Sequence, residues 1–298
     1  MRFLLLLITL FMCVNCDPGF PDRSLIEGYR VLGMVATPPE VGPFDTINLS
    51  LIEANEDDVQ YQWTACLASL GSSFGFQCVD EGLELPLPID GPVAAIDLSS
   101  EGIDFLGTLL KAFAELEQAN MSAMPSEGGD KEDCGEACQT RDGDKTEYTD
   151  IQIMVKSGPP SGRQVTTVKL IRVYFDDSER NQNPEILRFE RPSTAPIRPG
   201  EVVRFEYEVN TELYQTYTLV NGLELTEENI MTWYTTAGTF TLAPEKEGKE
   251  KNISTGSDAE MFLQLPSPLD ADSVTIWGIL RDERGGTDFR SLDLNITQ

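Results

Sequence analysis

From residue 30 onward, apolar and polar residues alternate in short runs. Residues 45–52 (DTINLSLI) place Ile47, Leu49 and Leu51 on one side of an extended chain, and residues 59–66 (VQYQWTAC) alternate in the same way. A period of two is typical of a β-strand with one buried face. We therefore predict a first β domain, with further strands of the same kind at 30–36, 151–155 and 164–175.

The second half of the chain repeats this pattern. The runs recur every roughly 8–15 residues, are separated by turn residues, and show no helical periodicity, which favours an antiparallel β-sandwich. We predict an all-β chain of two such domains. The expected strands of the second domain are 186–189, 202–209, 215–220, 230–242, 259–265, 273–281 and 289–296.

One segment has a different periodicity. Residues 104–119 (DFLGTLLKAFAELEQA) bring apolar side chains together at helical spacing, and Asp104 can cap the first turn. We expect this helix to pack its apolar face on the first sandwich; the alternative is a helix that binds a partner. The insertion of about residues 100–149 also contains an acidic loop with two cysteines. The apolar positions are Phe105, Leu106, Leu109, Leu110, Phe113 and Leu116.

Composition shifts along the chain suggest the domain boundaries. Residues 176–184 (DDSERNQNP) contain no apolar residue and end in a turn-forming Asn-Pro pair. We predict five segments: a signal peptide with a lipidation motif (1–16), a tether (17–28), the first domain (29–176), a linker (177–185) and the second domain (186–298).

The N-terminus has the features of an export signal. One arginine precedes an apolar run over residues 3–12, which is too short to span a bilayer and suits a secretory signal peptide. Cys16 ends this region in a manner similar to the lipidation motif of bacterial lipoproteins, and Cys13 is the alternative acceptor. We expect a lipid-anchored protein of the cell envelope, in the outer membrane or on the cell surface. The alternative is ordinary signal cleavage without an anchor.

The remaining four cysteines indicate disulfides. Cys66, Cys78, Cys134 and Cys138 form an even set in a chain that is expected to be exported. Four cysteines allow three connectivities, of which the local pairs Cys66–Cys78 and Cys134–Cys138 are the simplest. A metal or redox role for the closely spaced second pair is the alternative.

The charge balance restricts the partners. The chain of 298 residues has 50 acidic and 22 basic residues, a formal net charge of −28, and no histidine. Such a surface repels phosphate backbones, so nucleic acid is excluded as a direct partner. The absence of histidine removes histidine-dependent nucleophilic catalysis and zinc-histidine sites. The acidity itself fits a saline habitat, and recognition of a cationic substrate is the alternative.

Any catalytic site would have to use carboxylates, tyrosine, lysine or serine. Acidic neighbours are abundant, but a glycosidase needs two carboxyl groups at a fixed separation that the sequence does not reveal. No serine-nucleophile motif stands in a supporting context. Trp63, Trp233 and Trp277 lie within alternating strand patterns, so we expect them to pack in the core rather than to line a sugar-binding cleft. We therefore predict that the protein is not an enzyme, with a carboxylate-based carbohydrate-active enzyme as an alternative.

Calcium is the cofactor that the composition would permit, because oxygen atoms alone bind it. Asp142 and Asp144 form one candidate site in the acidic loop. Asp176, Asp177 and Asn183 form another in the linker, which is similar to the acidic linkers of cadherin repeats. We expect no obligatory cofactor, and the alternative is a calcium-stiffened adhesin or spacer.

The turns resemble a known class of domain. The segment 38–46 (PPEVGPFDT) and the segment 197–202 (IRPGEV) are similar to the opening turns of bacterial immunoglobulin-like domains, although Phe44 stands where a glycine is usual. Residues 233–240 and 277–286 are similar to segments of surface lipoproteins of myxobacteria and their relatives. The resemblance implies two immunoglobulin-like sandwiches and a surface location, and it transfers no catalytic residues.

These observations lead to one functional expectation. We predict an exported, lipid-anchored, non-enzymatic surface protein with a structural or protein-binding role. Its expected partners are the membrane, through the anchor, and a protein of the cell envelope.

Overall fold

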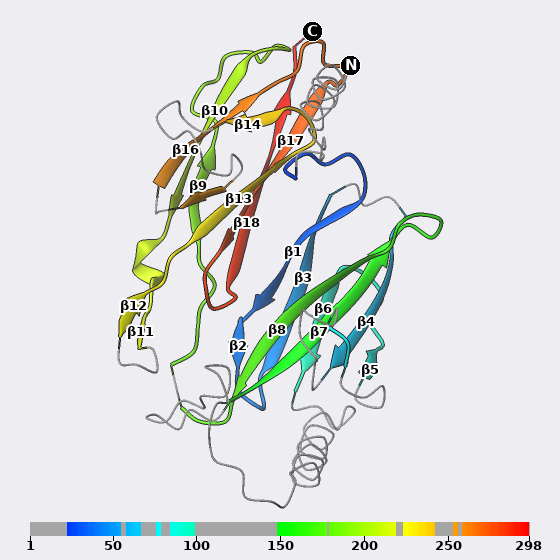
Figure 1. The fold of residues 1–298 in the computed structure, drawn as a ribbon, viewed down its shortest axis with the longest axis vertical. Helices are drawn as coiled ribbons and strands as arrows, with labels where there is room; N and C mark the ends of the chain where they lie inside the picture. The colour runs from blue at the N-terminus through cyan, green and yellow to red at the C-terminus, as the bar shows by residue number, and fades with distance from the viewer. Residues whose placement is uncertain are drawn as a thin grey trace, which may run out of the picture.

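The computed structural model describes two β-sandwiches that lie beside each other, staggered along the long axis (Figure 1). The described residues form strands and one 3-10 turn, and they contain no α-helix. The helix predicted over residues 104–119 lies outside the described residues. Tyr148 and Thr149, which we expected in the insertion, belong to a strand of the first sandwich. The described ranges are 23–54, 58–66, 76–78, 84–98, 148–177, 179–218, 223–241, 253–255 and 258–297.

The first sandwich has one sheet of three strands and one of five. Their orders are β1-β3-β6 and β2-β8-β7-β4-β5, and every neighbouring pair is antiparallel except β2 with β8. The strands are β1 (Arg30–Thr37), β2 (Glu40–Val41), β3 (Thr46–Ala54), β4 (Gln60–Cys66), β5 (Glu84–Leu87), β6 (Val93–Asp97), β7 (Tyr148–Gly158) and β8 (Val165–Tyr174).

The predicted alternation determines which residues enter the first core. Ile47, Leu49 and Leu51 of β3 all point inward, while Thr46 and Asn48 are exposed. Trp63 of β4 is fully buried between the sheets, and its indole N–H donates to the Gly91 carbonyl at 2.9 Å. A buried tryptophan needs such an acceptor for its one polar atom. The predictions of these strands and of a core role for Trp63 are therefore confirmed.

Three strands of the first domain were not predicted. β2 lies within the proline-rich segment that we expected to be only a turn, and its two residues pair in parallel with Arg172 and Val173 of β8. β5 and β6 are short and contain proline or alanine, which are poor strand formers. Cross-strand pairing and burial of Leu87, Ala94 and Ile96 override these weak local preferences.

The second sandwich consists of two four-stranded sheets and a separate hairpin. The orders are β14-β16-β10-β9 and β15-β13-β17-β18, with the hairpin β11-β12 between β10 and β13 in the chain. The elements are β9 (Ile186–Glu190), β10 (Val202–Val209), the 3-10 turn η4 (Thr211–Leu213), β11 (Thr216–Thr218), β12 (Glu224–Thr226), β13 (Ile230–Thr235), β14 (Thr239–Thr241), β15 (Ile253–Thr255), β16 (Asp258–Gln264), β17 (Ser273–Arg281) and β18 (Thr287–Asn295).

Aromatic rings dominate the core of the second sandwich. Trp233 of β13 is completely buried, and its ring stacks on Phe189 with centroids 5.1 Å apart. Phe205, Tyr207 and Phe240 surround it at tilted or edge-on angles, the arrangements that aromatic pairs prefer. The core role predicted for Trp233 is confirmed.

The single strand predicted over residues 230–242 was wrong. The chain leaves β13 after Thr235 and turns at Gly238, so that β14 joins the opposite sheet and pairs with β16. Gly238 has φ +95°, and a Cβ there would meet the Gln264 carbonyl oxygen at 2.6 Å. Only glycine fits this turn, which is the physical reason that the alternating pattern changes sheets.

The order of the principal strands in both domains matches that of immunoglobulin domains. In the first, β1, β3 and β6 correspond to strands A, B and E, and β8, β7, β4 and β5 to G, F, C and C′. In the second, β9, β10 and β16 correspond to A, B and E, and β18, β17 and β13 to G, F and C. Both buried tryptophans lie on strand C, where immunoglobulin domains place theirs.

The described part of the predicted tether, residues 23–28, lies on the second sandwich. Ile26 N–H donates to the Thr235 carbonyl and Thr235 N–H donates to the Ser24 carbonyl, both at 2.9 Å. This pairing forms a parallel bridge between Leu25 and Thr235, and Ser24 and Ile26 are buried. The chain thus contacts the second domain before it enters the first.

An apolar cluster joins the two sandwiches. Ile26, Leu32 and Ile52 from the N-terminal side pack with Ile279 of β17. We call this cluster the interdomain apolar core. The cluster connects the cores of the two sandwiches, because Ile279 belongs to the second sandwich and is fully buried against residues of the N-terminal side. The other members are Ala54, Val35, Tyr234, Trp277 and Phe289.

Shortening Ile279 should weaken the connection between the domains. Ile279→Ala leaves a cavity where both domains meet, so we expect a loss of about 2–5 kcal/mol in the free energy of unfolding. Ile230→Ala removes the same atoms from a side chain that is 40% exposed and should cost less than about 1 kcal/mol. Guanidinium chloride unfolding measures both variants, and equal losses would contradict the role of the cluster.

Candidate functional site

A polar cluster occupies the other end of the interface, around the turn between β17 and β18. Asp282 shapes this turn: its Oδ1 accepts the backbone N–H groups of Arg284 and Gly286 at 2.8 and 2.7 Å. The turn thereby directs the Arg284 side chain toward the first domain. We call the residues that meet here the junction cluster: Glu40, Lys169, Arg172, Asn181, Gln215, Glu227, Asp282 and Arg284.

Glu40 is the buried centre of the junction cluster. Its side chain is 1% exposed, and Oε2 accepts from Arg284 Nη2 at 2.8 Å and from the Asn181 backbone N–H at 2.5 Å. Arg172 Nη1 lies 3.7 Å from Oε1. β2 therefore places a carboxylate where β8 supplies a nearby cation, and where the linker and a turn of the second domain each donate a hydrogen bond.

Arg284 connects Glu40 to a second buried acid. Its Nη1 donates to Gln215 Oε1 at 2.8 Å and lies 3.4 Å from Glu227 Oε1. Burial is the main cause that raises the pKa of Glu227 above its ordinary value, while the backbone N–H of Gln215 acts in the opposite direction. One guanidinium thus neutralises two carboxylates that have little contact with water.

Lys169 forms a further bridge between the domains. It projects from β8, and its Nζ donates to the Gly285 carbonyl and to Thr287 Oγ1 in the second domain. The pKa of Lys169 is lowered to about 8, mainly by burial; the charge of Asp282 opposes this shift and that of Arg281 adds to it.

The linker is fixed rather than extended between the domains. Asn181 is buried and donates through Nδ2 to Asp282 Oδ2 at 3.0 Å. Asn183 donates to the Ala36 carbonyl of β1 at 2.7 Å and accepts the Thr287 N–H of β18 at 2.9 Å. Each of these two asparagines therefore connects the linker to a sandwich.

This geometry suits a structural role. The Glu40 carboxylate is 1% exposed and lies between two guanidinium groups, so its contacts are with the protein rather than with solvent. Buried, hydrogen-bonded ion pairs specify one arrangement of their elements, because separating the partners leaves an uncompensated charge. The junction cluster therefore fixes the orientation of the two sandwiches.

The residues predicted to bind calcium differ in exposure and in their hydrogen-bond partners. Asp176 is half-buried and Asp177 is exposed, whereas the Asn183 amide is engaged with Ala36 and Thr287. Asp142 and Asp144 lie outside the described residues. Within the described ranges, no group of three or more carboxylate or cysteine side chains is arranged to hold a metal ion.

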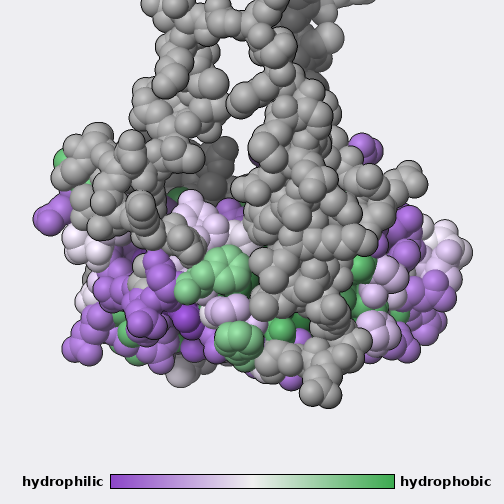
Figure 2. Space-filling view, turned by 90° about the horizontal axis from the view of Figure 1, so that it is seen from below, coloured by the Kyte–Doolittle hydropathy of each residue, from purple (hydrophilic) through white to green (hydrophobic). Residues whose placement is uncertain are grey.

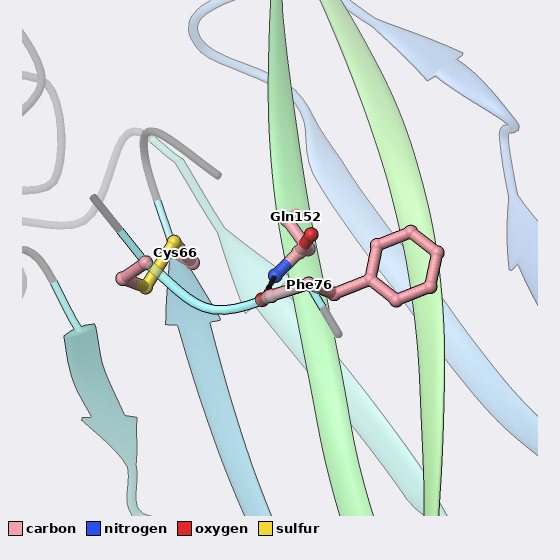
Figure 3. The surroundings of a disulfide bond; sticks show 4 residues. Cys66, Phe76 and Gln152 are labelled. Carbon is pink, nitrogen blue, oxygen red and sulfur yellow. Dashed lines mark hydrogen bonds between the residues drawn. A yellow bond between two sulfur atoms is a disulfide. The ribbon is translucent and has the colours of Figure 1, made fainter. Parts of the chain in front are cut away.

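The first local disulfide is present. Cys66 at the end of β4 is joined to Cys78, with Cα atoms 5.8 Å apart (Figure 3). The Gln152 side chain of β7 donates to the Phe76 carbonyl at 2.7 Å, so the cysteine-bearing segment is attached to two neighbouring strands. Cys134 and Cys138 lie outside the described residues, as do Cys13 and Cys16.

A third buried carboxylate lies near the opposite end of the first sandwich. Glu53 accepts hydrogen bonds from Tyr29 at 2.5 Å and from Tyr61 at 2.9 Å, and Tyr29 also bonds the buried Ser157 at 2.6 Å. Burial, followed by the bond to Glu53, raises the pKa of Tyr29. Ser157 has no exposed surface, so it is not accessible as a nucleophile. Near this end is an open depression lined by Asp58, Val59, Gln60, Pro159, Pro160 and Ser161.

In the part of the chain that the structure describes, no helix has the length and apolar character needed to cross a membrane.

No protein-family model matches the chain, and no curated protein sequence matches it. Solved structures give weak similarities. The fibronectin(III)-like modules of Clostridium thermocellum CbhA are 9% identical, with 91% of this chain and 94% of that chain covered and a TM-score of 0.26. The D00-D0 domain of intimin is 11% identical, with 91% and 99% covered and a TM-score of 0.25. A lipoprotein from Bacteroides thetaiotaomicron is 12% identical, with 41% and 88% covered and a TM-score of 0.27.

Sequence reasoning missed the junction cluster. In the sequence, Glu40 appeared only as part of the turn segment 38–46, and Arg284 only as part of the segment 277–286. Their separation of 244 residues leaves no local signal.

Removing Arg284 should strongly destabilise the protein. Arg284→Met leaves Glu40 and Glu227 without their shared guanidinium, and we expect a loss of about 3–5 kcal/mol in the free energy of unfolding. Arg290→Met breaks the half-exposed pair with Asp288 and should cost less than about 1 kcal/mol. Urea unfolding of the two variants compares these effects. Similar losses for both would show that burial of the Glu40 carboxylate does not matter.

Lys169 should make stability depend on alkaline pH. Its pKa is about 8 in the folded protein and 10.5 in the unfolded chain, so between these values the unfolded chain binds the proton more strongly. The free energy of unfolding should therefore rise as the pH increases from 8 to 10.5. Lys169→Met should remove this part of the rise, while Lys156→Met, at an exposed lysine of β7, should retain it. Urea titrations across this pH range measure the difference, and identical slopes in all three proteins would contradict the prediction.

Proposed function

We propose that the protein is an exported, lipid-anchored surface module with a structural or protein-binding role and without enzymatic activity. The observation that carries this proposal is the junction cluster: the described polar groups that come together from both domains are used to hold the domains to each other. A module of this kind holds its ends at a fixed separation, which is what a spacer or a display scaffold requires.

The interface supports a rigid unit. Domain pairs that are joined by a solvated linker move relative to each other by default. Here an apolar core lies at one end of the interface, a buried ion-pair cluster lies at the other, and the linker bonds both domains through Asn181 and Asn183. These contacts involve both side chains and backbone groups of the described residues.

The anchor is proposed from the sequence. The apolar run of residues 3–12 and the cysteine at position 16 provide a signal peptide and a lipid acceptor. The mature chain then carries a strongly acidic surface, which anionic headgroups repel, so the anchor has to supply the membrane affinity. Any cell-envelope protein partner would meet loops or sheet edges of the sandwiches.

The anchor can be tested directly in a bacterium that processes lipoproteins. Cys16→Ser should transfer the protein from the detergent-rich to the aqueous phase of a Triton X-114 extraction, because the acceptor thiol is lost. Cys13→Ser is the matched control and should stay in the detergent phase. A wild-type protein that enters the aqueous phase would refute lipid anchoring, and loss with Cys13→Ser alone would assign the anchor to Cys13.

A further inference from the structure

We infer that the second domain, although it comes later in the sequence, is the one that faces the membrane, and that the first domain forms the outer end. This inference rests on the proposed anchor at Cys16. It follows from the path of residues 23–28, which attach the start of the described chain to the end of β13.

The attachment is specific. Thr235 is the last residue of β13, and it exchanges two backbone hydrogen bonds with the segment through Ser24 and Ile26. Arg30 fixes the next turn of the path: its Nη1 donates to the Arg23 carbonyl at 2.6 Å, and its guanidinium lies 5.0 Å from the Tyr234 ring centroid. Arg23 is thus held against the second domain.

The end of the second domain near Thr235 also contains the loop before β17. The Thr275 N–H donates to Thr236 Oγ1, and Thr236 N–H donates to the Thr275 carbonyl, so the first residues of β17 lie next to the end of β13. Ser273 of β17 pairs with Asn295 near the C-terminus. Asp270, in this loop, is exposed and marks the end that we assign to the membrane side.

The length of the tether limits the alternatives. Seven residue steps separate Cys16 from Arg23, which span at most about 25 Å when fully extended. If residues 23–28 were free and the tether reached Tyr29, thirteen steps would span about 45 Å. The pairing of residues 23–28 with β13 therefore roughly halves the distance that the tether can span from Cys16. It also makes the second domain the point at which the tether joins the folded protein.

The far end of the first domain points away from this attachment. β1 runs from Arg30 to Thr37 and covers about 26 Å before the chain reaches β2 and the following turn. Phe44, in that turn, is 71% exposed, and Phe175 follows β8 at the same end. Figure 2 views the molecule from this end and shows apolar side chains among hydrophilic ones. In the proposed orientation this end faces the surroundings of the cell.

Energy transfer to a membrane can measure the orientation without relying on cellular lipidation. The mature chain, with Cys134→Ser and Cys138→Ser, is coupled through the Cys16 thiol to maleimide lipid in phosphatidylcholine vesicles that contain an acceptor-labelled lipid. A donor is attached through an azide-bearing residue at position 44 or 270. We expect energy transfer from position 270 to exceed that from position 44 by about twofold. The reason is that β1 alone places the two positions at heights above the membrane that differ by about 26 Å.

Equal transfer from the two positions, or stronger transfer from position 44, would overturn the inference. Ile26→Ser provides the internal control, because weaker packing of residues 23–28 lengthens the effective tether and should reduce the difference between the positions. An unchanged difference in a folded Ile26→Ser variant would show that this segment does not set the orientation. The Triton X-114 experiment tests the anchor separately, so failure of one proposal is distinguishable from failure of the other.

Discussion

The buried carboxylate of Glu40 is the constraint on which the arrangement of the two domains depends. A charge that is removed from water must be compensated, and its compensation here comes from three separate places: β8, the linker and the turn after β17. All three groups are far from Glu40 in the sequence, and only the folded structure brings them close to it. The burial of Glu40 therefore depends on the relative placement of the two sandwiches.

The rest of the interface follows from the same arrangement. β1 runs along the interface from its apolar end to its polar end. Leu32 of β1 enters the interdomain apolar core, and the Ala36 carbonyl of β1 accepts a hydrogen bond from Asn183 of the linker. Arg281 connects the two regions, because its Nη2 donates to the Leu32 carbonyl at 2.6 Å. Apolar burial supplies most of the attraction, and the polar contacts, which are directional, determine the angle.

Sequence reasoning predicted the strands whose alternation reports a half-buried face, such as β3 and β4, and the core role of Trp63 and Trp233. It could not predict β2, β5 and β6, which form because neighbouring strands pair with them. It also missed the change of sheet at Gly238, although the buried positions shift there from the odd-numbered Met231 and Trp233 to the even-numbered Phe240. The junction cluster lay beyond local reasoning altogether: Glu40 and Arg284 meet only through the tertiary fold.

If the two sandwiches are rigidly joined, the distance between a site on one and a site on the other has a single value, and an interdomain distance distribution measures it. Spin labels at the exposed positions Ser161 of the first domain and Asp270 of the second, in a Cys134→Ser and Cys138→Ser background, would report this distance by pulsed electron resonance. We expect one narrow distribution that is unchanged in about 1 M salt, because buried ion pairs are screened little. A broad distribution, or one that widens with salt, would contradict it.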